Sequence, residues 1–219
     1  MAYGATFDIE APAAALDKAQ VGLRIVIVIV IGWLANWIVG AAYWVLPILA
    51  AIMISQKGAD QYLAEAEKGP VRWIRYLMAF FSYISLASDK LAFDDPDSVN
   101  FKVTTSGKPT VGSALLRIIL AIPHALVLGI LGFVFFIVWI IAAISILANG
   151  TYPDWAFNFI RGYLKWNARV LAYMASLVDE YPPFSFEDGS APVATASPPP
   201  APPSPPAAAP PSDGPPPAQ

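Results

Sequence analysis

The stretch that decides the fold is Ile118–Ala148, IILAIPHALVLGILGFVFFIVWIIAAISILA, in which His124 is the only titratable side chain. A second apolar run, Ile25–Ile54, precedes it and has no ionisable side chain. Each run is about 30 residues long, whereas a helix needs only about 20 residues to cross the hydrocarbon core of a bilayer. The two runs therefore predict an integral membrane protein, predominantly α-helical.

The composition agrees with that class and excludes others. Only 13% of the residues are charged and 57% are hydrophobic, whereas soluble domains carry about 25% charged residues. A net charge of −3 leaves no basic footprint for nucleic acid. The chain has no cysteine and one histidine, so it predicts no disulfide framework and no histidine-based metal cluster. No nucleotide-binding loop or nucleophile motif is present, so we expect neither an enzyme nor a cofactor.

Each apolar run is followed by a segment of mixed polarity. Val71–Leu86 follows Gly69-Pro70, and Trp155–Val178 follows a Pro-Asp pair that is typical of a helix start. We predict an amphipathic helix in each segment. The basic residues of these two helices are Arg72, Arg75, Arg161, Lys165 and Arg169. The last three recur every fourth residue, so they form one basic stripe.

The two halves of the chain agree when one is shifted by 93 residues. This shift places Arg24 on Arg117, and each arginine opens an apolar run. It also aligns Trp73 with Trp166, Ala79 with Ala172, Phe93 with Phe186, and Asp95 with Asp188. When the shift is one residue longer, two candidate short strands also align: Phe7-Asp8-Ile9 and Phe101-Lys102-Val103. We therefore predict two tandem membrane units, residues 1–98 and 99–188.

Three arrangements of these units in a bilayer are open. The apolar run of each unit is a long tilted membrane helix with the amphipathic helix returning, or it is a re-entrant hairpin that turns near Asn36 and Gly129. Both arrangements keep the units in one orientation and place both termini on one side, which we expect to be the cytoplasm. In the third, each unit crosses once and the units have opposite orientations.

Residues 189–219 form a tail rich in proline and alanine, without lysine, arginine or aromatic residues. Such a composition has nothing to bury in a core, so we predict a disordered, extended tail. It serves either as a flexible extension or as a docking segment for a proline-binding partner.

The candidate functional residues are basic or lie within the apolar runs. We predict that seven basic side chains contact lipid headgroups: Arg24, Arg72, Arg75, Arg117, Arg161, Lys165 and Arg169. Asn36 and His124 are the predicted intramembrane polar residues. For His124 we expect a structural hydrogen bond, with a proton-transfer or ligand-binding role as the alternative. No catalytic residue and no metal ligand is predicted.

The second half of the chain resembles a bacterial membrane family known as a domain of unknown function, DUF4389. Four elements carry the resemblance: Arg117-Ile-Ile-Leu-Ala-Ile-Pro-His124; Asn149-Gly150-Thr151-Tyr152-Pro153; Trp166-Asn-Ala-Arg169-Val170 with Ala172-Tyr173; and Glu180-Tyr-Pro-Pro-Phe184. They span about Phe101–Asp188, and the first half matches less completely. The resemblance implies a bacterial inner-membrane protein and implies no activity.

These observations favour a non-catalytic scaffold or accessory subunit of the inner membrane. It would bind anionic lipids and either a membrane-protein partner or further copies of itself. Two alternatives stay open: a membrane-shaping protein with re-entrant hairpins, and a subunit of an oligomeric transporter or channel.

Overall fold

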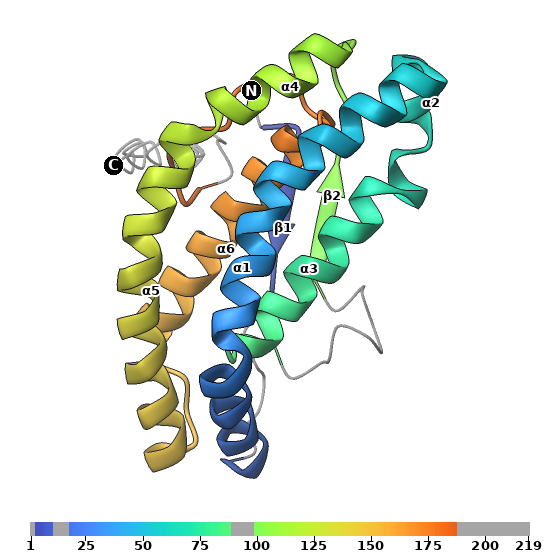
Figure 1. Cartoon of the computed structure of the whole chain (residues 1–219). Helices are drawn as coiled ribbons and strands as arrows, with labels where there is room; N and C mark the ends of the chain where they lie inside the picture. Colours follow the sequence, from blue (N-terminus) through green and yellow to red (C-terminus); the bar gives the residue numbers. More distant parts are fainter. Residues whose placement is uncertain (1–2, 11–17, 89–98, 188–219) are drawn as a thin grey trace, which may run out of the picture.

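The computed structural model describes residues 3–10, 18–88 and 99–187 (Figure 1). Within them the chain is mostly helical, with seven helices and two short strands. In chain order these are β1 (Ala5–Asp8), α1 (Lys18–Lys57), α2 (Ala59–Ala64), a 3₁₀ helix (Ala66–Lys68), α3 (Pro70–Ile84), β2 (Asn100–Val103), α4 (Val111–Leu120), α5 (Ile122–Asn149) and α6 (Asp154–Met174). The predicted tail, residues 189–219, lies outside the described residues.

The two apolar runs form the long helices. The first lies within α1, and the second forms the end of α4 and all of α5 except Asn149. Of the arrangements left open by the sequence, the re-entrant hairpin is wrong, because Asn36 and Gly129 both lie inside continuous helices. Long apolar side chains flank both residues, so neither residue ends its helix. A single glycine lowers the stability of a helix by only about 1 kcal/mol. Gly150 ends α5 in a left-handed conformation with φ 76°, as the Asn-Gly pair predicts.

A local signal separates α4 from α5. Thr110 and Ser113 form a reciprocal capping box at the start of α4, with N–O distances of 3.1 and 2.8 Å. Helix α5 begins at Ile122, and Pro123 occupies its first turn. Proline is tolerated there because the first amide groups of a helix have no partner within it. The chain therefore changes direction near Ala121 instead of continuing as one straight helix.

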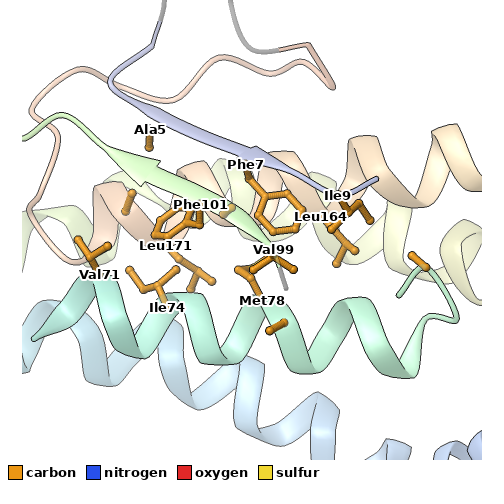
Figure 2. Close-up of a cluster of buried hydrophobic side chains, with 14 of the residues drawn as sticks. Ala5, Phe7, Ile9, Val71, Ile74, Met78, Val99, Phe101, Leu164 and Leu171 are labelled. Carbon is orange, nitrogen blue, oxygen red and sulfur yellow. The ribbon is translucent and has the colours of Figure 1, made fainter. Parts of the chain in front are cut away.

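The helices and strands form three layers. Helix α1 lies beside α4 and α5 and runs in the opposite direction to α5 (Figure 1). The start of α1 is therefore close to the end of α5, where the Lys18 ammonium donates to the Ala148 carbonyl. Behind this layer, α3 packs beside α6. The strands pair antiparallel with Phe7 opposite Phe101 and cover the far side of α3 and α6. Figure 2 shows the side chains of the sheet facing Ile74 and Met78 of α3 and Leu164 of α6.

Helices α3 and α6 end in the same way. Leu86 and Ser176 adopt left-handed φ values of 65° and 55°, just after the helix ends. The following amide nitrogens, of Ala87 and Leu177, donate to the carbonyls of Ser82 and Ala172 at 3.0 and 3.1 Å. Both ends are therefore Schellman turns. These turns correspond at a shift of 90 residues, not 93 (from residue 86 to 176).

Candidate functional site: an apolar face and its buried arginines

One side of the molecule exposes its apolar side chains. Among the residues whose side chains the structure describes, nearly all of the exposed large hydrophobic ones lie on α1, α4 and α5; the others are Trp73, Trp155, Tyr181 and Phe184. We call this surface the apolar face: the exposed side chains from Leu23 to Ile52, Val111 to Leu120 and Ile122 to Leu147. Within the described residues, Gly40–Lys57 and Ile122–Asn149 are long and apolar enough to cross a membrane. An exposed apolar surface of this extent marks a contact with lipid or protein.

The opposite side of the molecule is polar. On the outer surface of the two strands, Thr6, Asn100 and Lys102 are exposed. Beside them, the Arg161 guanidinium donates to both carboxylate oxygens of Asp8, at 2.6 and 2.7 Å. This pair is partly exposed. The molecule as a whole is therefore amphipathic, with α3 and α6 between an apolar layer and a polar one.

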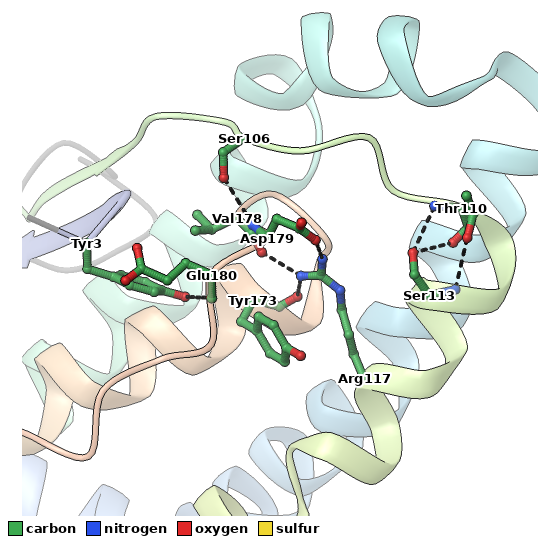
Figure 3. A network of polar contacts seen from close by, with 9 residues as sticks. All are labelled: Tyr3, Ser106, Thr110, Ser113, Arg117, Tyr173, Val178, Asp179 and Glu180. Atoms are coloured by element: carbon green, nitrogen blue, oxygen red, sulfur yellow. Dashed lines mark hydrogen bonds and ion pairs between the residues drawn. The ribbon is translucent and has the colours of Figure 1, made fainter. Parts of the chain in front are cut away.

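Arg117 of α4 is buried in the last turn of α6. Its guanidinium donates to the carbonyls of Tyr173 and Val178 at 2.7 and 2.6 Å, and to the Asp179 carboxylate at 2.9 Å (Figure 3). It also lies 4.4 Å from the centre of the Tyr173 ring. A planar guanidinium suits several fixed acceptors at once. Arg117 thus supplies a donor to the Val178 carbonyl and a second donor to the Tyr173 carbonyl, which also accepts from the Ser176 amide at 2.9 Å.

The first strand enters the same region. The Tyr3 hydroxyl donates to the Glu180 carbonyl at 3.2 Å (Figure 3). Burial raises the pKa of this hydroxyl above its usual range, so Tyr3 is a neutral donor. The described start of the chain is therefore attached to the segment that follows α6.

Arg24 of α1 repeats this arrangement in the first half of the chain. It is fully buried, and its guanidinium lies 4.1 Å from the centre of the Tyr83 ring. It donates to the Ser88 carbonyl at 2.9 Å and to the Gln20 side chain at 3.2 Å. In both halves, one accepting carbonyl lies five residues after the tyrosine whose ring the arginine contacts: Ser88 after Tyr83, and Val178 after Tyr173.

His124 is buried in a cluster of aromatic rings. The Trp166 indole N–H donates to its Nδ1 at 3.0 Å. The imidazole stacks on Phe184, with ring centres 4.1 Å apart, and lies 4.7 Å from Tyr181. Because Nδ1 accepts the indole hydrogen, a neutral imidazole carries its proton on Nε2. The cluster attaches the Tyr181-Pro-Pro-Phe184 segment to α5 and α6.

Arg169 of α6 holds the end of the same segment. Its guanidinium is fully buried and donates to the Ser185 and Glu187 carbonyls. About two helical turns earlier, Gly162 makes room for the Phe186 ring: a Cβ at Gly162 would lie 2.7 Å from Phe186 Cγ. The segment that follows α6 therefore needs two features of that helix: the buried guanidinium of Arg169, and a glycine at position 162.

Adding a methyl group at Gly162 tests this contact. Gly162→Ala is expected to lower the free energy of unfolding by about 1–3 kcal/mol, because Phe186 must move away from α6. Gly22→Ala in α1 is the matched control, since a Cβ there meets nothing within 4 Å. It is expected to be neutral or slightly stabilising. Equal thermal stability of the two variants in one detergent would contradict the close packing of Phe186.

The remaining predicted basic residues vary in exposure. Lys165 lies 3.8 Å from the Asp8 carboxylate. Arg75 donates to Glu67 and to the Phe101 carbonyl, at 3.1 and 3.2 Å. Arg72 is exposed beside Tyr76. The headgroup role stays a prediction; Arg72 is placed to perform it, whereas Arg24, Arg117 and Arg169 are hydrogen-bonded inside the protein.

His124 and Arg169 both contact the segment that follows α6. The sequence analysis did not predict this shared contact. The motif Glu180-Tyr-Pro-Pro-Phe184 was the available signal, because proline and aromatic residues after a helix mark a fixed segment. Asn36 lies inside α1, and its side chain is outside the described residues. In the described part of the chain, no group of three or more metal-ligating side chains occurs.

Residues 112–185 match the model of a protein family described as a domain of unknown function (DUF4389). No curated protein and no solved structure matches the chain. The matched segment begins in α4 and ends within the segment that Arg169 holds. The segment that matches this family model contains Arg117, His124, Trp166 and Arg169.

Proposed function

We propose that this protein is a non-catalytic membrane scaffold whose apolar face lies in a lipid bilayer and whose sheet faces water. The observation that carries the proposal is that nearly all exposed large hydrophobic side chains of the described residues lie on α1, α4 and α5. Burying one such side chain contributes about 1.5–3 kcal/mol, so the face as a whole strongly favours lipid over water. As a scaffold or accessory subunit, the protein would present the polar layer to a partner.

The position of the Asp8–Arg161 ion pair favours one orientation of the protein in the bilayer. Tyr163, on α6 between Arg161 and Lys165, contacts Phe135 at the middle of α5, with ring centres 4.8 Å apart. If α5 crossed the bilayer, Asp8 and Arg161 would lie near its centre, partly exposed to lipid. Ionised side chains are costly there. We therefore favour an arrangement in which α1 and α5 lie along the membrane plane in one leaflet.

We also infer that the fold consists of two tandem units related by an approximate twofold axis. The pairing of Phe7 with Phe101 supports it, because equivalent residues lie opposite each other only on such an axis. The matching environments of Arg24 and Arg117 support it independently. An axis through an antiparallel strand pair is perpendicular to the sheet. In the proposed arrangement it coincides with the membrane normal, so both units have the same orientation.

Single cysteines on this cysteine-free chain test the proposal. The protein is added to preformed vesicles and treated with a maleimide that does not cross membranes. Thr6→Cys on the sheet is expected to react fully, and Ile130→Cys on the apolar face only after detergent is added. Lys57→Cys and Thr151→Cys mark the far ends of α1 and α5. Both are expected to react from outside.

Two results would contradict the proposal in different ways. Reaction of Lys57→Cys or Thr151→Cys, but not both, would show that the long helices cross the bilayer. Equal reaction of Ile130→Cys and Thr6→Cys in intact vesicles would show that the apolar face is not in lipid. The latter outcome would remove the membrane function altogether.

A further inference from the structure

A cavity of about 970 Å³ lies between α1, α3, α5 and α6. Its floor consists of buried side chains, including Met78 of α3 and Leu164 and Leu171 of α6. Its rim includes Ile29 of α1 and Phe133 and Ile144 of α5, which are exposed. The cavity therefore opens on the apolar face and reaches through the first layer to the helices behind it. Its volume is at the upper end of the range of roughly 300–1,000 Å³ that is typical of ligand pockets.

The polar side chains of the lining are already satisfied within the protein. The Ser85 hydroxyl donates to the Ser82 carbonyl at 3.0 Å, and the Tyr163 hydroxyl to the Leu128 carbonyl at 3.3 Å. The Asn167 amide donates to the Tyr163 carbonyl at 2.9 Å and accepts from the Tyr43 hydroxyl at 3.2 Å. An occupant thus needs no hydrogen-bonding groups at this depth. A polar solute would lose its hydration without compensation.

We propose that this cavity binds one acyl chain of a bilayer phospholipid, which enters between α1 and α5. The inference rests on the proposed function, because the opening must face the hydrocarbon region for an acyl chain to reach it. A flexible alkyl chain restores the dispersion contacts that the lining otherwise lacks. The chain inserts perpendicular to the apolar face, toward α6, and leaves its headgroup outside the cavity.

A phospholipid with a diazirine near the end of one acyl chain provides the probe. The full-length protein is reconstituted in vesicles that contain it, illuminated, and mapped by mass spectrometry of its peptides. We expect adducts on the cavity floor, at Leu164 or Leu171 of α6, in addition to adducts on exposed residues such as Ile137. Floor residues are buried behind α1 and α5, so lipid outside the cavity does not reach them.

Two glycine substitutions give a matched comparison. Gly129 lines the cavity, and a Cβ there meets nothing within 4 Å, so Gly129→Leu fills free space. Gly40 of α1 is equally open but lies outside the lining. Gly129→Leu is expected to cause a severalfold loss of the floor adducts, and Gly40→Leu no loss. Val28→Phe, which narrows the cavity from α1, is expected to act like Gly129→Leu.

The outcomes separate this inference from the proposed function. Adducts on Ile137 without adducts on α6 would overturn the acyl-chain site while leaving the membrane face intact. The same would follow if neither Gly129→Leu nor Val28→Phe reduced the floor adducts. Absence of adducts anywhere on the protein would instead refute the proposed membrane function.

Discussion

Replacing Arg117 by methionine is expected to lower the free energy of unfolding by about 2–5 kcal/mol. Methionine retains the apolar stem but leaves the Val178 carbonyl without the Arg117 donor. It also removes the charged hydrogen bonds to the Asp179 carboxylate and to the Tyr173 carbonyl, which keeps its bond from the Ser176 amide. Each unsatisfied buried acceptor costs about 1–3 kcal/mol. For a chain of this size the melting temperature falls by about 2–4 °C per kcal/mol. Thermal unfolding in a single detergent, followed by circular dichroism, measures the loss.

Two control variants separate the causes. Arg72→Met removes the same chemical group from an exposed site and is expected to leave the melting temperature unchanged. Arg117→Lys keeps the charge but loses the planar fork and the contact with the Tyr173 ring, so we expect an intermediate loss. If Arg117→Met were as stable as Arg72→Met, the buried hydrogen bonds would not support the end of α6.

The sequence predicts that Arg24 and Arg117 are equivalent, but it does not predict what surrounds them. Position identified Arg24 and Arg117 as equivalent, and their environments match. Their surroundings could not be predicted, because an arginine at the start of an apolar run fits a lipid headgroup as well as a helix end. The carbonyls that accept their hydrogen bonds belong to residues more than 50 positions away. No local pattern specifies such a contact.

Local signals predicted the long helices, the amphipathic helices α3 and α6 and the two short strands, but not α4 as a separate helix. Length and hydropathy indicate the two long helices, and the alternating polarity around Phe101 indicates β2. The three-layer packing depends instead on which face of α6 meets the protein. The stripe of Arg161, Lys165 and Arg169 is typical of a solvated face, yet it meets Asp8 and the segment after α6. Periodicity defines a face but not its neighbour.

The two tryptophans that align in the sequence are expected to differ widely in their contribution to stability. Trp166→Ala should cost about 3–5 kcal/mol, because the indole is buried against His124, Phe184 and Phe186. Trp73→Ala should cost less than about 0.5 kcal/mol, since its side chain is 74% exposed. The melting temperatures of the two variants in one detergent give the comparison.

This difference also tests how the two halves correspond. A shift of 93 residues pairs Trp73 with Trp166, but the Schellman turns of α3 and α6 correspond at 90, which pairs Tyr76 with Trp166. Trp166→Phe keeps the ring contacts and removes only the hydrogen bond to His124, so about 1 kcal/mol should separate it from the native protein. Equal losses in Trp73→Ala and Trp166→Ala would restore the 93-residue correspondence and contradict the buried aromatic cluster.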